Sequence, residues 1–253
     1  MALEPRSPRL AVLIDADNTS AKIADRLFQE IAQLGEASVR RIYGDFTRPG
    51  LRGWTEILAK HAIIAHQQFA YVTGKNASDI ALVIDAMDLM HSGRFEGFCL
   101  VSSDSDFTRL AARIREEGLD VFGFGERKTP ESFRQACRRF IYTENLLGEA
   151  APTETRIAQG QGDALPLLKT AIAQMDSDDG WVGLGALGTR LANLAPDFDP
   201  RSYGVAKLSD LVRKSGAFEI DQSEGRRVRV RLKPETAAPK PRRRRRPSAP
   251  RVS

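Results

Sequence analysis

The stretch FCLVSSDSDF, residues 98–107, places two carboxylates and three hydroxyls directly after an apolar run. The apolar residues 98–101 predict a buried strand, and a helical pattern resumes at Phe107. RLAVLIDADNTS, residues 9–20, has the same design, because Asp15, Asp17 and Asn18 follow an apolar run. Each acidic segment is therefore expected where a buried strand ends.

Predicted helices separate the predicted strands along the first 125 residues. Strands are expected at 9–14, 37–42, 62–65, 98–101 and 120–124, and helices at 21–34, 51–60, 78–90 and 107–117. This alternation is typical of an α/β fold with a parallel sheet covered by helices on both faces. Ligands of such sheets bind at the carboxyl ends of the strands. The acidic segments that follow the first strand and the strand at 98–101 are therefore expected to meet at one edge of the sheet.

KNASDIALVIDAMDLM, residues 75–90, supplies a third group of acids. Its predicted helix is apolar nearly all round, which is typical of a buried helix. Asp79, Asp85 and Asp88 interrupt it, and a buried carboxylate is costly unless it is paired or bound to a cation. Capping is the alternative role for Asp79, with Ser78 as a competing cap, and for Asp106 at the next helix.

Three acidic segments on one rim favour a metal site over unrelated caps. Mg²⁺ takes a few oxygen ligands and retains several waters. A metal bound there can activate water and screen the charge of a phosphodiester. Ser102 and Ser103 are interpreted as partners of a metal-bound water or a phosphate, or as hydroxyls that satisfy the turn. Lys75 is a candidate phosphate contact, or an exposed loop lysine.

A polar stretch at 149–162 without a hydrophobic pattern is interpreted as a linker after a first domain at 1–148. Helical patterns at 164–175, 184–194 and 202–215 follow, and then a predicted hairpin from 218–221 and 228–232. Three helices and a two-stranded wing predict a small winged-helix domain at 163–234. The Pro/Arg-rich tail, 235–253, is predicted to be disordered.

The net charge of +5 is unevenly distributed. Residues 226–253 carry twelve Lys/Arg against one acid, a net charge of +11, which leaves −6 for the rest. The basic end, rather than the acidic body, is therefore expected to attract a polyanion. The two cysteines are interpreted as reduced core residues, and no apolar run has membrane-spanning length, so a cytoplasmic protein without a membrane partner is expected.

LIDADN, the pattern K-x₃-D-x₅-D at 75–85 and VSSDSDF, in this order, resemble the NYN domain, in particular the LabA-like branch of the PIN-like nuclease superfamily. The resemblance covers roughly residues 8–145. It implies a Rossmann-like PIN fold, a Mg²⁺ or Mn²⁺ site and ribonuclease activity. The catalytic metal ligands that it implies, direct or through water, are Asp15, Asp79, Asp104 and Asp106.

The same resemblance implies supporting residues. Asn18 accompanies Asp15, and Asp85 matches the second helix acid of the pattern. Six residues on a helix place Asp85 about 120° round from Asp79. Asp85 is therefore expected to support the ligands, together with Asn18, Ser102 and Ser103, rather than to bind the metal.

The segments GWV at 180–182, PDFD at 196–199, YG at 203–204 and KLSDL at 207–211 resemble the OST-HTH (LOTUS) domain. The resemblance implies binding of RNA, single-stranded or structured, or docking of a protein partner. Trp181 and Phe198 are expected in its core. The candidate RNA contacts are Arg201, Lys207, Arg213 and Lys214, joined by Arg242, Arg243, Arg244, Arg245 and Arg246 of the tail.

The leading hypothesis is a metal-dependent ribonuclease with an RNA-binding winged helix. DADNT also fits the DxDxT opening of haloacid-dehalogenase-type phosphatases, in which Asp15 would be the nucleophile. That class requires a later GDxxxD-like motif, where this chain has SDSDF. A third hypothesis is a PIN-like scaffold that binds RNA or protein without cutting.

Overall fold

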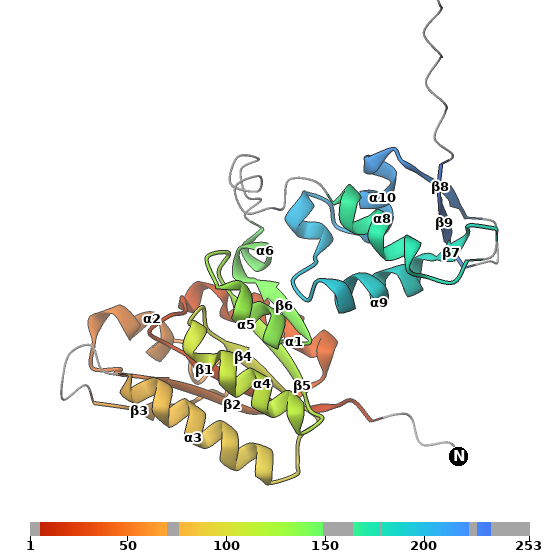
Figure 1. Ribbon diagram of the computed structural model, residues 1–253. Helices are drawn as coiled ribbons and strands as arrows, with labels where there is room; N and C mark the ends of the chain where they lie inside the picture. Colours follow the sequence, from red (N-terminus) through yellow and green to blue (C-terminus); the bar gives the residue numbers. More distant parts are fainter. Residues whose placement is uncertain (1–5, 70–75, 149–163, 178, 223–226, 234–253) are drawn as a thin grey trace, which may run out of the picture.

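Six strands form the sheet of the N-terminal domain, in the order β3-β2-β1-β4-β5-β6 (Figure 1). The computed structural model describes residues 6–69, 76–148, 164–177, 179–222 and 227–233. All five strand pairs in this sheet are parallel. The strands are β1 (Arg9–Asp15), β2 (Glu36–Gly44), β3 (Ile64–Gln67), β4 (Gly97–Val101), β5 (Asp120–Gly125) and β6 (Arg139–Tyr142). The strand order reverses between β1 and β4, and such a switch point is where an open α/β sheet binds its ligands.

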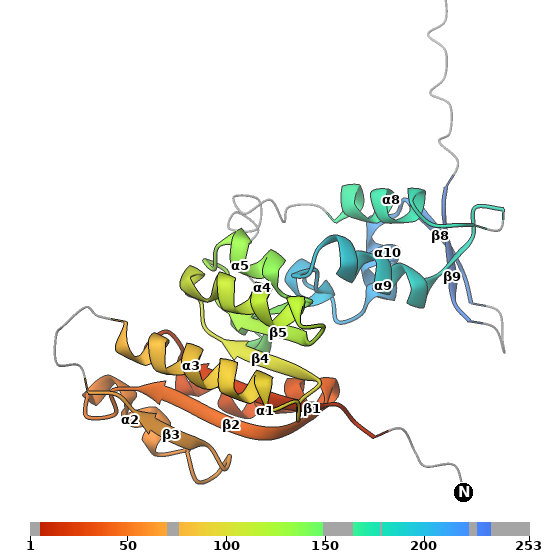
Figure 2. The same ribbon diagram turned by 60° about the horizontal axis from the view of Figure 1, so that its bottom comes forward.

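Helices cover both faces of the sheet, which explains the continuous apolar run of β1. Alternate β1 residues enter two apolar clusters, Ala11 and Leu13 on one face and Val12 and Ile14 on the other. The first cluster is covered by α3 (Ala77–His91), α4 (Thr108–Glu116) and α5 (Glu131–Ala136). The second is covered by α1 (Ala24–Leu34), α2 (Arg52–Thr55) and α6 (Thr143–Leu147). Figure 2 shows α3 and α4 next to each other over the sheet.

Both acidic loops lead into their helices in the same way. After β1, the short 3₁₀ helix η1 (Ala21–Ile23) precedes α1, and after β4, η3 (Ser105–Phe107) precedes α4. Ser20 caps η1 by accepting a hydrogen bond from the Lys22 N–H, and Asp104 caps η3 by accepting from the Asp106 N–H. The sequence predictions of helices at 21–34 and 107–117 are therefore correct in place, with a 3₁₀ turn at each start.

Two sequence predictions about helices are wrong. The helix expected at 51–60 is only η2 (Pro49–Leu51) followed by the four-residue α2. Gly53, Thr55 and Ile57 favour a helix weakly, which is consistent with this early end. The helix α3 is not buried all round, because Ile80 and Ile84 are 60% and 58% exposed on its outer side. One face of α3 packs on the sheet, and no second layer covers the other among the described residues.

The C-terminal domain is a winged helix, as predicted. It contains α8 (Leu165–Ala173), α9 (Leu184–Leu194), the 3₁₀ helix η4 (Pro200–Tyr203), α10 (Leu208–Ser215) and an antiparallel sheet of β7 (Val182–Gly183), β9 (Arg229–Leu232) and β8 (Phe218–Asp221), in this order. Leu168, Leu187 and Val212 are fully buried in its own apolar cluster. Phe198 packs against this cluster. Trp181 lies outside it, and the guanidinium groups of Arg229 and Arg231 lie 5.6 and 4.7 Å from the centre of its ring.

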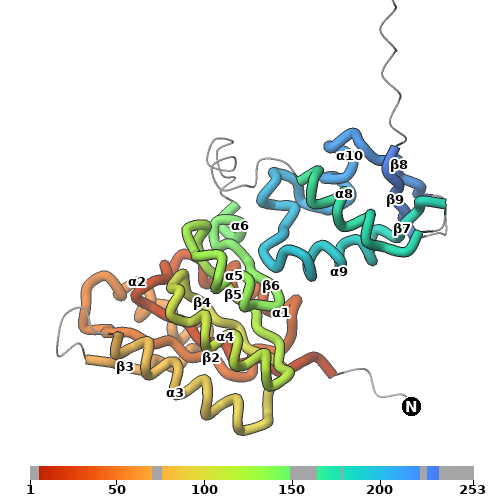
Figure 3. The backbone as a smooth tube through the Cα atoms, viewed as in Figure 1, coloured from red at the N-terminus to blue at the C-terminus, as the bar shows by residue number. Residues whose placement is uncertain are grey.

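The two domains touch through residues 196–203, beside β6 (Figure 3). The Phe140 N–H donates to the Pro196 carbonyl at 2.8 Å, and the Tyr142 hydroxyl donates to Asp197 at 2.5 Å. Each domain keeps a separate apolar core, so this contact is polar in character. Within the described part of the chain, no helix has the length and apolarity needed to cross a membrane.

Candidate active site

The acidic segments meet at the carboxyl ends of β1 and β4, on either side of the switch point. Asp15 is the last residue of β1, and Ser102, Ser103 and Asp104 follow β4 directly. Asp79 lies in the first turn of α3. The expected convergence of three segments is therefore present. Parallel pairing brings the ends of β1 and β4 together, and the packing of α3 on the sheet brings Asp79 to them.

Asp15 is 1% exposed and is held by four hydrogen bonds. Its Oδ2 accepts from Ser102 Oγ at 2.7 Å and from Asn18 Nδ2 at 2.8 Å. Its Oδ1 accepts from the backbone N–H groups of Asp17 and Asn18. Burial raises the pKa of Asp15, while the hydrogen bonds from Ser102 and Asn18 oppose that rise. Asp15 is thus a buried carboxyl group that fixes the loop after β1.

Side-chain hydrogen bonds join the three segments pairwise. Ser102 Oγ reaches Asp15, which ties the loop after β4 to β1. Ser78 Oγ donates to Asp17 Oδ2 at 3.1 Å, which ties α3 to the loop after β1. Asn76 Nδ2 donates to Asp106 Oδ2 at 3.1 Å, which ties the start of α3 to the loop after β4. The carboxylates are therefore held by a closed set of polar contacts.

Asp79 is the electrostatic centre of this cluster. Burial and the charges of Asp15, Asp104, Asp106 and Asp17, in that order, raise the pKa of Asp79 to about 6. Four carboxylates from two other segments thus act on one helix acid. Carboxylates this close disfavour each other's ionisation, and a nearby cation would reverse the effect.

Helix capping explains only one of these acids. Asp104 is the cap of η3, while Asp106 lies inside that turn. The N-cap of α3 is Asn76, so neither Ser78 nor Asp79 caps that helix. The alternative of a capping role is therefore excluded for Asp79 and Asp106, and their position needs another reason.

The fit of a metal to this cluster depends on how many ligands the metal requires. Among the residues that the structure describes, no group of three or more His, Cys, Asp or Glu side chains is arranged to hold a metal ion. Mg²⁺, however, retains several waters and binds proteins through one or two carboxylates. Asp104 is half-buried and Asp106 is exposed, so both offer carboxylate oxygens to a hydrated ion. The donor set fits such an ion and does not form a closed cage.

Asp85 belongs to a different network. Its carboxylate accepts hydrogen bonds from Arg41 and from the Tyr43 hydroxyl, both on β2. It is not among the carboxylates that raise the pKa of Asp79. The turn of about 120° between the two acids therefore directs Asp85 to the β2 side of α3.

Ser103 lies one residue beyond the Asp15 contact. Its Oγ accepts a hydrogen bond from the Glu126 N–H at 2.8 Å, which joins the loops after β4 and β5. The residue also lines a cavity of about 270 Å³ at the strand ends. Gly125, at the end of β5, allows this close approach, because a Cβ there would lie 2.6 Å from the Ser102 carbonyl oxygen.

The candidate RNA contacts have varied surroundings. Lys207 is exposed, Arg213 pairs with Asp210 at 3.2 Å, and Lys214 donates to the Tyr203 carbonyl at 3.3 Å. Lys75 and the five tail arginines lie outside the described residues.

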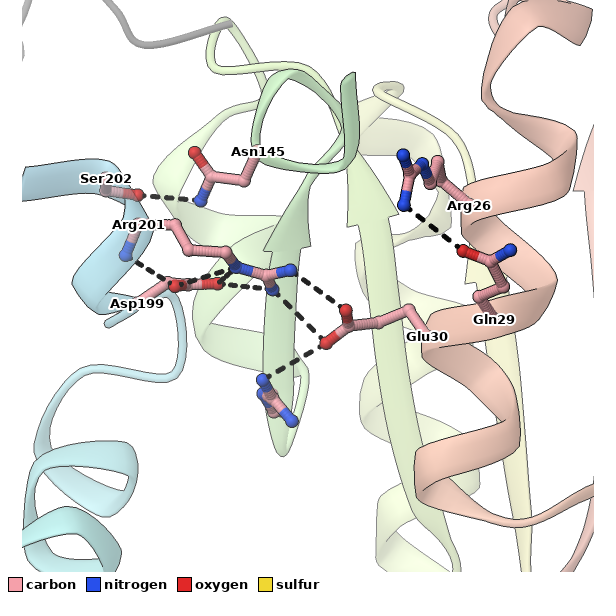
Figure 4. A network of polar contacts seen from close by, with 8 residues as sticks. Arg26, Gln29, Glu30, Asn145, Asp199, Arg201 and Ser202 are labelled. Atoms are coloured by element: carbon pink, nitrogen blue, oxygen red, sulfur yellow. Dashed lines mark hydrogen bonds and ion pairs between the residues drawn. The ribbon is translucent and has the colours of Figure 1, made fainter. Parts of the chain in front are cut away.

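Arg201 lies in the contact between the domains (Figure 4). Its guanidinium bonds Glu30 of α1 at 2.9 and 3.2 Å, and Asp199 at 2.6 to 3.1 Å. Burial alone would lower the pKa of Arg201, but the bonds to Asp199 and Glu30 outweigh burial and raise it. Beside it, Asn145 Nδ2 donates to Ser202 Oγ at 2.9 Å. Arg201 thus connects the two domains, and its donors face protein carboxylates.

Three residues near the acids were not identified from the sequence as part of the site. Asn76 and Ser78 bind the acids directly, and Arg48 lies 3.8 Å from Asp17, measured from its Nη1 to Oδ1. The available signal for Asn76 and Ser78 was the presence of two polar residues within the three positions before the helix acid. No local pattern indicated Arg48, because its position depends on how the loop after β2 packs.

Family models of two domains agree with this architecture. A family model of the NYN domain matches residues 9–147, and one of the OST-HTH/LOTUS domain matches residues 159–230. No curated protein matches the chain. A crystal structure of a protein of unknown function from Vibrio parahaemolyticus is similar, with 19% identity and a TM-score of 0.46 over 54% of this chain and 93% of that one. The chain therefore belongs to the NYN domain family and carries a C-terminal OST-HTH/LOTUS domain.

Proposed function

We propose that this protein is a ribonuclease that depends on Mg²⁺ or Mn²⁺. The observation that carries the proposal is the meeting of the acidic residues of three segments at the switch point, joined by the Ser102–Asp15, Ser78–Asp17 and Asn76–Asp106 hydrogen bonds. Burial and four neighbouring carboxylates raise the pKa of Asp79 there. Such a concentration of negative charge repels a phosphodiester unless a cation is present. Membership of the NYN family, a group of PIN-like nucleases, supports RNA as the substrate.

The side chains divide the work according to their exposure. Asp79, Asp104 and Asp106 have accessible oxygens and would hold the cation, directly or through its waters. Asp15 keeps the loop after β1 in place and adds buried charge, with Asn18 and Ser102 fixing its orientation. When bound, the metal supplies an activated water and screens the phosphate. Ser78 and Asn76 keep Asp17 and Asp106 in position.

The C-terminal domain and the tail would retain the RNA. The family association of OST-HTH/LOTUS domains with RNA supports this role. Lys207, Arg213 and Lys214 are exposed on this domain, whereas Arg201 is occupied by Glu30 and Asp199. Docking of a protein partner on the same domain is the alternative. The +11 segment at 226–253 would add sequence-independent attraction through phosphate contacts.

The phosphatase alternative conflicts with the burial of Asp15. A nucleophilic carboxylate must reach its substrate. Asp15 is 1% exposed, and four N–H and O–H donors occupy its oxygens. The scaffold alternative is consistent with the lack of a closed metal cage among the described residues. Only an activity measurement separates it from the nuclease.

Cleavage of single-stranded RNA with Mn²⁺, with and without a chelator, tests the proposal. Asp15→Asn, Asp79→Asn and Asp104→Asn are each expected to lower cleavage by about 100-fold or more. Asp88→Asn is the matched control, since Asp88 is exposed on the outer side of α3. Circular dichroism checks that every variant is folded. If the wild-type protein binds RNA but does not cut it under any of these conditions, the scaffold hypothesis replaces the nuclease.

A further inference from the structure

A cavity of about 660 Å³ lies directly beside the acid cluster. The loop after β1, from Asp17 to Lys22, forms one wall, and the loop after β2, from Arg48 to Trp54, forms the opposite wall. Glu126 and Lys128, after β5, close one end. The cavity shares Asp17 and Asn18 with the site, so it is continuous with the acids.

Buried contacts fix the shape of this groove. Trp54 is 1% exposed, and its indole N–H donates to the Thr19 carbonyl at 2.8 Å, which fastens the two walls together. Gly44 allows the loops to approach, because a Cβ there would lie 2.9 Å from Ala16 Cβ and from Leu51 Cδ1. The shape of the groove is therefore fixed by contacts within the folded chain.

Cations outnumber carboxylates along the groove. Lys22, Arg48 and Lys128 line it, against Asp17 and Glu126. Lys128 pairs with Glu126 at 2.8 Å. Lys22 is exposed and makes no ion pair with any described residue. The groove thus offers positive charge next to a strongly negative cluster.

Arg48 is the cation nearest to the acids. Its guanidinium forms ion pairs with Asp17 at 3.8 Å and with Asp45 at 3.7 Å, and both distances are longer than a hydrogen bond. Both carboxylates already accept shorter bonds, Asp17 from Ser78 and Asp45 from Thr47 and Gln67. The Arg48 side chain is 47% exposed, and its guanidinium donates no hydrogen bond to any described residue. Its planar set of N–H donors is therefore available to a phosphate, which arginine binds in bidentate fashion.

We propose that this groove binds the sugar–phosphate backbone of the RNA strand next to the cleavage position, with Arg48 on the phosphate nearest the acids and Lys22 and Lys128 on those beyond. This inference rests on the proposed function, since it takes RNA to be the substrate. The contacts involve phosphate rather than bases, so they are independent of sequence. The groove offsets the repulsion that the five acids impose on the same strand.

RNA binding in EDTA tests the groove separately from cleavage. The full chain and its Lys22→Ala/Arg48→Ala/Lys128→Ala variant are titrated with a fluorescent oligouridylate and with an unrelated single-stranded RNA, at several salt concentrations. Loss of three phosphate contacts is expected to weaken binding about tenfold for both RNAs and to lower the salt slope by about 2. Arg138→Ala is the charge control, because Arg138 is exposed next to the amino-terminal end of β6 and pairs with Asp120.

Gly50 provides a second, independent variant. A Cβ at this groove residue would meet no atom within 4 Å, so Gly50→Asp adds a carboxylate without steric conflict. It is expected to weaken RNA binding several-fold, whereas Gly50→Ser, of similar size and uncharged, is not. Thermal unfolding of both variants should match that of the wild-type protein.

The outcomes of these experiments distinguish the proposed RNA binding in the groove from the proposed ribonuclease activity. An unchanged salt slope in the triple variant, or an equal loss in Arg138→Ala, overturns the groove whether or not the protein cuts RNA. A groove-dependent affinity in a protein that never cleaves overturns the ribonuclease instead and leaves the groove standing.

Discussion

At the residue scale, the acid cluster lowers the stability of the metal-free fold, because its carboxylates repel one another. Asp79 is half-buried among like charges, and its pKa is about 6 instead of 3.8. The folded state therefore binds its proton more tightly than the unfolded chain does. The contribution of Asp79 to the free energy of unfolding is fully present below about pH 4 and is lost as the pH rises through about 6.

Asp79→Asn is accordingly expected to stabilise the metal-free protein. The free energy of unfolding of the variant should exceed that of the wild-type protein by an amount that grows between about pH 4 and pH 6 and stays constant above. This amount should be about 1 kcal/mol, because the partial exposure of the side chain reduces the effect of the pKa shift. Urea denaturation in EDTA at several pH values measures it. Asp88→Asn should show no such dependence, and a pH-independent difference for Asp79→Asn would contradict the coupling. Added Mg²⁺ should then raise the stability of the wild-type protein more than that of Asp79→Asn.

The main acids could be found from the sequence, and their neighbours could not. Acids that follow apolar runs fall at strand ends, and parallel pairing brings such ends together. Arg48 lies next to Asp17 because Trp54 fastens one loop to another, a tertiary contact 35 residues apart. Glu30 is a similar case, because its partner Arg201 is 171 residues away. Composition and periodicity report neither kind of contact.

At the element scale, α3 shows why an apolar helix need not be buried. Leu82, Ala86, Leu89 and Met90 form its inner face, while Ile80 and Ile84 point outward. The all-round apolar pattern predicted burial, but the single sheet can cover only one side. The strands at 9–14 and 98–101 were predicted correctly, since helices cover both of their faces. In contrast, β6, α5 and α6 have short, mixed patterns and were not predicted.

Substitutions on the two sides of α3 are expected to differ in cost. Ile84→Lys should change the free energy of unfolding by less than about 0.5 kcal/mol, because the side chain is 58% exposed. Leu82→Ala should lower the free energy of unfolding by about 2–5 kcal/mol, because Leu82 is 2% exposed in the apolar cluster between the sheet and α3, α4 and α5. Chemical denaturation of both variants checks this. A large loss in Ile84→Lys would mean that another chain covers this face in solution.

At the scale of the whole molecule, the two domains are connected by polar contacts. Their described residues form separate apolar cores. Yet Arg201, Asp197, Ser202 and the Pro196 carbonyl all bond the N-terminal domain. These contacts give the winged helix a defined orientation relative to the N-terminal domain.

Breaking the contact at Arg201 is expected to release the winged helix without removing an RNA contact. Glu30→Gln removes the charge that pairs with Arg201, and with Arg139 of β6 at 3.4 Å, and keeps the Arg201–Asp199 bonds. Arg201→Ala removes the bonds to both Glu30 and Asp199. Each should enlarge the radius of gyration in small-angle X-ray scattering. A double-mutant cycle on the free energy of unfolding should give a coupling energy of about 1–2 kcal/mol between Glu30 and Arg201, since Glu30 is 7% exposed. Arg213→Ala, whose partner Asp210 lies within the same domain, is the control.

The same variants distinguish the two roles considered for Arg201. If Arg201 contacts RNA, its replacement should weaken RNA binding and leave the scattering profile unchanged. The bonds to Glu30 and Asp199 favour the opposite result, because a guanidinium held by two carboxylates has few donors left for phosphate. Glu30→Gln is decisive here, since it alters no basic residue at all. If its scattering profile matches that of the wild-type protein, the Glu30–Arg201 pair does not hold the domains together in solution.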